Sequence, residues 1–254
     1  MYERYLHWRD RQIVGDIDLT VVLPTYNEAR RVVPTIAAFA ACLSETELDW
    51  ELIVADDGST DATREIVRQL GHANIWVSPA PRNAGKGDAV RRGLTAARGA
   101  AVLFADADNA TPAAEIHALL AELSQGADIV IGSRAAAGAD VRHRSPLRRL
   151  MTAGLRTVVR VGLGLGVRDT QCGFKLFTAE AAHRIAAAQT IPGFAFDLEE
   201  LYLARRFGYR VVEVPVTWFD APGSTVSPIA EAARFVRSII RIRWNGMRGV
   251  YRYA

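Results

Sequence analysis

Short apolar runs alternate with amphipathic segments along the first half of the chain. The runs predict buried strands, and most are followed by a segment whose apolar residues recur at helical spacing. The predicted strands cover residues 19–23, 51–55, 73–79, 100–106 and 127–134. The predicted helices lie within residues 29–43, 61–70, 82–97 and 111–123. This alternation predicts an α/β fold, with a mainly parallel sheet covered by helices on both faces.

Polar residues mark where two of these helices start. Thr111 is predicted to cap the fourth helix, with Pro112 at its first position, where a missing N–H matters least. Ser59 or Thr60 is predicted to cap the second helix, with the Asp61 carboxylate near its positive end.

Polar motifs follow three of the predicted strands directly. They are "PTYNE" at 24–28, "DDGS" at 56–59 and "DADN" at 106–109. Ligands of such sheets bind beyond the carboxyl ends of the strands, so we expect the functional site there. The first strand lacks the glycine fingerprint of a dinucleotide fold, and no Walker lysine motif occurs. The "GLGLG" at 162–166 follows a basic segment and is interpreted as a linker.

The predicted site is rich in carboxylates, which repel a bare phosphate but suit a divalent metal. They are Glu28, Asp56, Asp57, Asp106 and Asp108. Mg²⁺ or Mn²⁺ is typically held by one or two carboxylates together with substrate phosphate oxygens. We therefore expect Asp106 and Asp108, an Asp-x-Asp motif, to bind a metal–diphosphate. The alternative is that Asp108 only starts the turn into the next helix.

Length and composition favour a globular protein in a reducing compartment. The chain has 254 residues, 50% of them hydrophobic, which is enough for one sizeable domain with appendages. Its two cysteines, Cys42 and Cys172, lie far apart and form no disulfide framework. No apolar run is long enough for a membrane span, and the first twelve residues do not resemble a signal peptide. We expect a cytoplasmic location.

Charge divides the chain into an acidic front and a basic back. Residues 1–141 contain 13 basic and 20 acidic residues, whereas residues 142–254 contain 18 and 8. The basic half predicts an anionic partner, unless its arginines only keep the protein soluble. The chain has only two lysines, Lys86 in "NAGKG" and Lys175 in "CGFK". Because a lysine ammonium differs chemically from a guanidinium, we assign Lys86 to a nucleotide site and Lys175 to an acceptor region.

Six motifs together resemble one known family. They are "VVLPTYNE", "VADDGSTD", "RNAGKGDAVRRG", "FADADNATP", "GSR" and "DTQCGFKLF". The chain resembles family 2 glycosyltransferases of the GT-A fold over about residues 18–220. More narrowly, it is similar to the polyprenyl-phosphate sugar synthases, and its later motifs favour the glucosyl branch over the mannosyl one.

The resemblance implies roles for residues of the donor site. Pro24, Tyr26 and Glu28 would hold the nucleoside, and Asp57 would contact the base or ribose. Asp106 and Asp108 would bind the metal and the diphosphate.

One departure from the family weakens the mannosyl interpretation. Mannose synthases can add a glutamine metal ligand two residues past the second aspartate, where this chain has Ala110. Either the metal has fewer protein ligands or Asn109 contributes one.

The acceptor side rests on basic residues and one carboxylate. The resemblance implies that Arg134 of "GSR" contacts the acceptor phosphate, and the segment that holds Arg148 and Arg149 supplies further candidates. Asp197 and Glu199 of "FAFDLEE" are the remaining candidates for a catalytic base, and Asp197 is predicted to touch the sugar or the acceptor phosphate. The alternative is an ordinary capped helix whose solvated side carries Glu199 and Glu200.

The resulting hypothesis is metal-dependent, inverting transfer of a hexose, with UDP-glucose favoured, to a polyprenyl or dolichyl phosphate. A phosphate monoester has a second pKa of about 6 and needs no general base. Three alternatives stay open. They are a GDP-mannose-dependent polyprenyl-phosphate transferase, a family 2 transferase acting on a sugar hydroxyl, and a non-catalytic basic module for membrane or nucleic acid. We expect no nucleic-acid partner, because aromatic residues do not interleave the arginines as a reading element would require. The sequence leaves the oligomeric state open.

Two basic segments predict contact with the cytoplasmic face of a membrane. We divide the chain into a catalytic domain at 1–225, with a basic amphipathic insertion at 142–165 on the acceptor side, and a basic amphipathic segment at 226–254. In the last segment an apolar stripe comprises Ile229, Ala233, Val236, Ile240, Trp244, Met247 and Tyr251. Arginines beside such a stripe are typical of a helix lying on an anionic membrane. The alternative is that the stripe packs on the domain, and a break is expected near Gly246 or Gly249.

Overall fold

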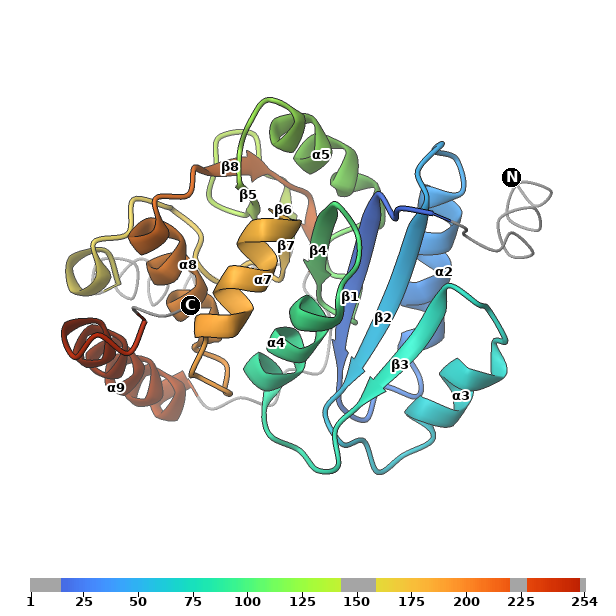
Figure 1. The fold of residues 1–254 in the computed structure, drawn as a ribbon, viewed down its shortest axis with the longest axis horizontal. Coiled ribbons are helices and arrows are strands. Elements are labelled where there is room, and N and C mark those ends of the chain that lie inside the picture. Colours follow the sequence, from blue (N-terminus) through green and yellow to red (C-terminus); the bar gives the residue numbers. More distant parts are fainter. Residues whose placement is uncertain (1–14, 143–158, 220–227, 252–254) are drawn as a thin grey trace.

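The computed structural model describes residues 15–142, 159–219 and 228–251, which form an α/β fold around one large sheet. Seven strands pair in the order β3-β2-β1-β4-β7-β5-β8 (Figure 1). Their bounds are β1 Leu19–Thr25, β2 Trp50–Asp56, β3 Ile75–Pro79, β4 Ala101–Ala105, β5 Ile129–Ser133, β7 Phe174–Thr178 and β8 Val211–Pro215. A second small sheet pairs β6 Val141–Arg142 with β9 Trp218–Phe219.

Helices cover both faces of the sheet. Their bounds are α2 Val32–Leu43, α3 Thr63–Gln69, α4 Lys86–Ala96, α5 Ile116–Ser124, α7 Ala179–Ala188, α8 Phe196–Phe207 and α9 Pro228–Met247. Figure 1 shows α4 and α7 in front of the strands and α2 behind them. This cover explains why every residue of β1, β2 and β4 is buried, as parallel strands with both faces packed require.

The predicted alternation of five strands and four helices is confirmed, but β7 and β8 were not predicted. Strand β7 runs antiparallel between β4 and β5, whereas the remaining pairs of the large sheet are parallel. Its sequence, "FKLFT", contains the charged Lys175 within an apolar run, so periodicity gives no clear hint of a strand there. The insertion of β7 places the "DTQCGFKLF" motif directly beside β4.

Three helix starts differ from the expectation. The second helix, α3, begins after Ala62, which supplies no side-chain cap, so the predicted cap at Ser59 or Thr60 is wrong. The first helix begins at Val32 rather than residue 29, because the preceding loop turns through Asn27, whose φ is +56°. The fourth begins with a 3₁₀ turn, η1 Ala113–Glu115, after an extended Pro112 with ψ of 141°. Thr111 therefore does not cap it and Pro112 is not its first helical residue, so both predictions are wrong. A turn that carries Asp108 and Asn109 displaces the start of the helix.

Helix α9 buries a different stripe from the predicted one. Its buried residues on the described part are Phe235, Ile239, Ile242 and Gly246. The predicted stripe, apart from Tyr251, faces outward on the described turns: Val236, Ile240, Trp244 and Met247 are 45–70% exposed. The helix ends at Met247, and Gly249 has a φ of +75°, near the expected break. The alternative that the predicted stripe packs on the domain is therefore wrong for Val236, Ile240, Trp244 and Met247, and membrane contact stays a prediction.

The part of the chain that the structure describes contains no helix long and apolar enough to cross a membrane.

Candidate active site

The carboxyl ends of β1 and β2 are joined by a network of loop hydrogen bonds. The Asn27 carboxamide accepts from the backbone N–H of Thr60 at 2.9 Å, and the Asn27 N–H donates to Ser59 Oγ at 2.9 Å. Pro24 is buried at the end of β1, whereas Tyr26 is 45% exposed. Glu28 accepts two hydrogen bonds of 2.6 Å from Arg31. The "PTYNE" and "DDGS" motifs therefore meet at one edge of the sheet, as predicted.

Asp57 holds the turn that carries Lys86. Its two carboxylate oxygens accept from the backbone N–H groups of Ala84 and Gly85, each at 2.8 Å. Asp57 is 3% exposed, so little of its surface is free for a ligand. The predicted contact with base or ribose stays a prediction, and the structure adds a role that the sequence did not suggest.

Lys86 and Asp106 form an ion pair at the end of β4. The ammonium lies 2.6 Å from Asp106 Oδ1, and Lys86 begins α4 directly after Gly85, whose φ is +112°. The same ammonium lies 5.4 Å from the centroid of the Phe104 ring. Lys86 is therefore fixed beside the first aspartate of the Asp-x-Asp motif, where it offsets negative charge on that side.

Asp106 and Asp108 have the chemistry of a divalent metal site. Burial and the charge of Asp106 raise the pKa of the Asp108 carboxyl. The two carboxylates repel each other, and a bound cation would relieve this repulsion. Among the described residues, no cluster of three or more side-chain ligands surrounds a point that could hold a metal. Two carboxylates nevertheless fit Mg²⁺ or Mn²⁺, because these ions take their other oxygens from water and phosphate.

The turn after Asp108 aims its carboxylate. Asp108 Oδ1 accepts from the Ala110 N–H at 3.1 Å, and Asn109 takes a left-handed φ of +54°. The Asn109 side chain is exposed, whereas Ala110 lines the pocket described below. The suggestion that Asn109 replaces the missing glutamine therefore gains no support.

Gly173 leaves room for Asp106. The Asp106 N–H donates to Gly173 O at 2.9 Å, and a Cβ at Gly173 would lie 2.0 Å from Asp106 Oδ2. Only glycine allows the strand β7 backbone to approach this carboxylate so closely. The glycine of "CGFK" is thus a requirement of the site.

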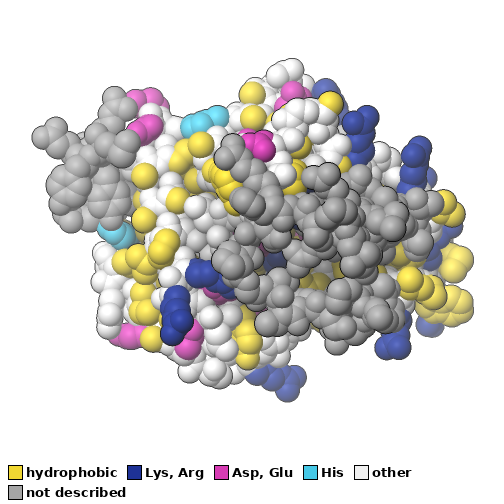
Figure 2. Space-filling model, turned by 180° about the vertical axis from the view of Figure 1, so that it is seen from behind, with side chains coloured by type: hydrophobic (Ala, Val, Ile, Leu, Met, Phe, Trp, Pro, Cys, Tyr) yellow, Lys and Arg dark blue, Asp and Glu magenta, His cyan; other side chains and the backbone are white. Residues whose placement is uncertain are grey.

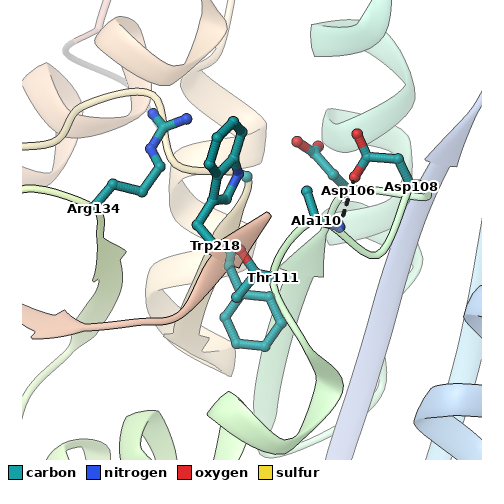
Figure 3. A pocket seen from close by; sticks show the side chains of 8 residues that line it. Asp106, Asp108, Ala110, Thr111, Arg134 and Trp218 are labelled. Carbon is teal, nitrogen blue, oxygen red and sulfur yellow. Dashed lines mark hydrogen bonds between the residues drawn. The ribbon is translucent and has the colours of Figure 1, made fainter. Parts of the chain in front are cut away.

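An open pocket of about 390 Å³ lies between Asp106 and Arg134. Its lining residues are Asp106, Asp108, Ala110, Thr111, Arg134, Gly173, Phe174 and Trp218. Figure 3 shows the two carboxylates at one end, the guanidinium at the other, and the Trp218 indole standing between them. The pocket therefore combines a cation-binding end with an anion-binding end.

Trp218 is held by the small second sheet. The Phe219 N–H donates to Ala110 O at 2.9 Å, and the Trp218 N–H donates to Asp140 O at 2.8 Å. The Arg134 guanidinium carbon lies 5.5 Å from the centroid of the indole ring. The sequence analysis missed Trp218, which follows Asp108 by more than a hundred residues and reaches the pocket only through β9.

Arg134 is oriented by Asp169. Arg134 Nε and Nη2 donate to the two Asp169 oxygens at 2.8 and 2.9 Å. Burial by itself raises the pKa of Asp169, but the hydrogen bonds and charge of Arg134 outweigh it and lower that pKa to about 2. The guanidinium stays charged and points its remaining N–H groups along a fixed direction. Asp169 opens the "DTQCGFKLF" motif, yet nothing in the sequence pairs it with "GSR".

Lys175 and Asp197 do not line the pocket. They are predicted to contact acceptor or sugar, but the Lys175 ammonium is fully buried and hydrogen-bonded to Asp197 Oδ1 in the core. Glu200 Oε2 lies 3.6 Å from the same ammonium. Burial lowers the pKa of Lys175 and raises that of Glu200.

The alternative that α8 has a solvated acidic side is also wrong. Glu199 and Glu200 are 0% and 1% exposed, because α7 and α9 pack on α8 and close over these positions. The other predicted acceptor residues, Arg148 and Arg149, lie outside the described residues, as does most of the 142–165 segment.

Solved structures share this fold. Glucosyl-3-phosphoglycerate synthase from Mycobacterium tuberculosis, solved with Mn²⁺, UDP-glucose and phosphoglyceric acid, superposes with a TM-score of 0.63 at 22% identity, covering 89% of this chain and 78% of that one. Mannosyl-3-phosphoglycerate synthase from Rubrobacter xylanophilus gives 0.65 at 19% identity, covering 93% and 75%. The predicted GT-A fold is confirmed.

Curated relatives are more similar in sequence. A dolichyl-phosphate beta-glucosyltransferase from Dictyostelium discoideum is 34% identical, covering 94% of this chain and 78% of the relative. The human protein of that name is also 34% identical, covering 92% and 77%, and the one from Saccharomyces cerevisiae is 32% identical, covering 93% and 77%. The family model described as glycosyl transferase family 2 matches residues 20–185, a span that holds both aspartates and Arg134. The chain is a glycosyltransferase that belongs to glycosyl transferase family 2.

Proposed function

We propose that this enzyme transfers glucose from UDP-glucose to a polyprenyl phosphate such as dolichyl phosphate. The observation that carries the proposal is the pocket with Asp106 and Asp108 at one end and Arg134 at the other (Figure 3). The names of the curated relatives support the acceptor and the sugar, and the neighbour solved with Mn²⁺ and UDP-glucose supports the donor and the metal.

The carboxylate end suits the leaving diphosphate. A Mg²⁺ or Mn²⁺ ion held by Asp106 and Asp108 would neutralise the charge that develops there. Lys86 lies 2.6 Å from Asp106 and brings a fixed positive charge to the same place. These three residues hold and orient the donor.

The arginine end suits a phosphate acceptor. Arg134 is held by Asp169 in a single orientation, and guanidinium groups bind phosphate through paired N–H donors. An acceptor phosphate oxygen forms the new bond to the anomeric carbon, while the bond from that carbon to the diphosphate breaks and UDP leaves with the electron pair. The dianion needs no protein base, which agrees with Asp197 lying outside the pocket wall. Attack opposite the leaving group inverts the anomeric carbon.

The Trp218 indole lies where the transferred sugar must pass between these ends. A flat aromatic wall contacts the apolar face of a hexose and excludes water from the space between donor and acceptor. Because the Trp218 N–H is hydrogen-bonded to Asp140 O and the neighbouring Phe219 N–H to Ala110 O, the indole is well placed to hold the sugar in line with the incoming phosphate.

A transfer assay tests the proposal. The purified protein is incubated with a short polyprenyl phosphate, Mn²⁺ and labelled UDP-glucose or GDP-mannose in separate tubes, each with and without EDTA. We expect label in the lipid fraction from UDP-glucose alone, and its loss with EDTA. Transfer from GDP-mannose instead would move the assignment to mannose, and label in a soluble sugar acceptor alone would replace the phosphate acceptor by a hydroxyl.

We further propose that the enzyme works at the cytoplasmic face of a membrane, docked through α9. The uncovered face of this helix carries Val236, Ile240, Trp244 and Met247, and Figure 2 shows hydrophobic side chains gathered with basic ones at the α9 edge of the molecule. The exposed arginines beside them are Arg237, Arg241, Arg243 and Arg248. This combination suits an anionic lipid surface. Both cysteines are free thiols, as suits a reducing compartment.

Sedimentation with vesicles of phosphatidylglycerol and phosphatidylcholine tests this docking. Replacing Ile240 and Trp244 together by serine should weaken binding at least about ten-fold, because each buried side chain contributes roughly 1.5–3 kcal/mol. The control replaces Ala118 and Ala121, on the exposed face of α5, by serine and should change nothing. Equal binding by both variants would show that α9 does not reach the lipid.

A further inference from the structure

Glu199 is a buried carboxylate that the pocket does not use. It is 0% exposed and accepts four hydrogen bonds. Its Oε2 accepts from the backbone N–H groups of Thr190 at 2.8 Å and Ile191 at 2.7 Å. Its Oε1 accepts from Thr190 Oγ1 at 2.6 Å and from the Tyr251 hydroxyl at 2.7 Å. A carboxylate so fully bonded in a low-dielectric setting fixes every group around it.

These bonds tie Tyr251, four residues beyond the end of α9, to the loop at 189–193. Tyr251 is 1% exposed, and its ring packs 6.0 Å from that of Tyr202. Asn245 Nδ2 donates to Thr190 Oγ1 at 3.2 Å and to the Tyr251 oxygen at 3.4 Å. Asn245 thus bonds Thr190 directly, and Tyr251 reaches the same loop residue through Glu199.

The loop in turn supports the glycine turn around Lys86. Gln189 Nε2 donates to Gly87 O at 2.8 Å, and the Asp88 N–H donates to Pro192 O at 3.1 Å. A Cβ at Gly85 would lie 2.4 Å from Pro192 O, and one at Gly87 would lie 2.6 Å from Ile191 O. The loop backbone is packed against both glycines that flank Lys86, so any shift of the loop must shift the lysine.

Lys86 is where this chain of contacts reaches the donor end of the pocket. Its ammonium lies 2.6 Å from Asp106, and the turn before it is held by Asp57 from the other side. Two buried carboxylates, Asp57 directly after β2 and Glu199 on α8, therefore fix the turn and its supporting loop.

We propose that Glu199 and Tyr251 are positioning residues for the donor nucleotide. They hold the 189–193 loop against the Gly85–Lys86–Gly87 turn and so keep Lys86 beside Asp106. The proposal rests on the proposed function for the identity of the donor. It assigns a role to the last turn of the described chain, which lies away from the pocket.

Calorimetry in the absence of acceptor tests the proposal directly. The Tyr251→Phe protein keeps the ring and loses the hydroxyl, and UDP and GDP are titrated in the presence of Mn²⁺. For the nucleotide that the wild type binds, we expect affinity to fall five- to ten-fold. Tyr209→Phe is the matched control, because its hydroxyl lies 3.3 Å from Glu180 on an exposed part of α7 and should leave affinity unchanged.

Steady-state kinetics separate positioning from general damage. The KM for the nucleotide sugar should rise with Tyr251→Phe while the KM for polyprenyl phosphate stays within two-fold. Unchanged nucleotide affinity in a folded Tyr251→Phe protein, or an equal rise in both KM values, would overturn the proposal. Binding without glucosyl transfer would refute the proposed function alone. Wild-type protein that binds neither nucleotide would refute both.

Hydrogen exchange on the wild type gives a second readout that needs no variant. Nucleotide and Mn²⁺ should slow exchange of the Thr190 and Ile191 amides, which Glu199 binds, although neither residue lines the pocket. Exchange there that is indifferent to nucleotide would contradict the coupling.

Discussion

Two aspartates near the pocket, Asp108 and Asp169, have pKa values shifted in opposite directions. Asp108 is disfavoured as an anion by burial and by Asp106, whereas Asp169 is stabilised as an anion by Arg134. The Asp106/Asp108 pair therefore favours binding of a cation, and the Arg134–Asp169 pair keeps Arg134 charged and able to bind an anion. The two ends of the pocket are distinguished by their charge partners, not by the residue types alone.

Removing the Asp108 charge should strongly weaken metal-dependent nucleotide binding and leave the fold intact. Asp108→Asn keeps an oxygen to accept from Ala110 and relieves the repulsion with Asp106. UDP affinity in Mn²⁺ should fall on the order of 100-fold, and the melting temperature should not drop. Glu122→Gln on α5 is the control for loss of one negative charge. Near-normal affinity in folded Asp108→Asn would sink the metal assignment.

Arg134 should matter for the acceptor more than for the donor. Arg134→Ala should raise the KM for polyprenyl phosphate about 10- to 100-fold, the value of one or two charge-assisted hydrogen bonds, and change the KM for UDP-glucose little. Asp169→Asn breaks the same ion pair but keeps the guanidinium, so its effect on the acceptor should be much smaller. If both variants lose acceptor affinity alike, the loss reflects the broken pair and not phosphate binding.

The Arg134–Asp169 pair should stabilise the fold in a defined pH window. Because the folded pKa of Asp169 is lowered to about 2, its contribution is present above the unfolded value near 4 and is lost as pH falls towards 2. About 1 kcal/mol should be lost by pH 3. Urea unfolding of wild type and Asp169→Asn at pH 6 and pH 3 measures the difference in free energy of unfolding between the two proteins. A difference that is no smaller at pH 3 than at pH 6 would contradict the assignment.

At the scale of elements, α9 shows how one helix serves two surfaces. Its buried and exposed apolar stripes are offset by one or two residues along the described turns. Phe235, Ile239 and Ile242 face inward, and Val236, Ile240 and Trp244 face outward. A period of 3.6 residues fits both stripes, so the sequence cannot tell which one meets the domain.

A matched pair of substitutions separates the two faces. Ile242 is 0% and Ile240 64% exposed. Ile242→Ala should destabilise the protein by about 2–4 kcal/mol through the cavity it leaves, whereas Ile240→Ala should cost less than about 0.5 kcal/mol. Chemical denaturation measures both values. Comparable losses would show that the outward face also packs on protein.

At the scale of the whole molecule, the proposed membrane docking and the proposed support of the donor site both involve α9. The exposed face of α9 is proposed to meet the lipid, and its end reaches the donor turn through Tyr251 and Glu199. The basic back half of the sequence supplies the outward arginines, and the acidic front half supplies the carboxylates of the pocket.

Salt should weaken membrane binding without abolishing it. Raising NaCl from 0.05 to 0.5 M shortens the Debye length from more than 10 Å to less than 5 Å and screens the arginines, but leaves the apolar stripe unaffected. We expect the fraction sedimenting with phosphatidylglycerol vesicles to fall several-fold while a salt-resistant part remains. Complete release would mean that the stripe does not insert, and no salt effect would exclude a role for the arginines.

The sequence alone determined the strand–helix alternation, the edge of the sheet that holds the site, and the Asp106/Asp108 pair. These features depend on local patterns: apolar runs of strand length, helical spacing, and polar residues where strands stop. The family resemblance of the sequence added Arg134.

Only the tertiary structure decided which distant residues meet. Antiparallel β7 brings Gly173 against Asp106 and buries Lys175 with Asp197, and β9 brings Trp218 into the pocket. Arg134 donates to Asp169, a pairing that the sequence does not predict. Glu199 is buried, although the sequence predicted a solvated side of its helix. Each of these outcomes depends on pairing between segments that are far apart in the sequence. The local pattern of a segment does not predict which distant segment it will pack against. Side-chain spacing fixes a helix or strand, but burial and charge partners are set by what packs against it.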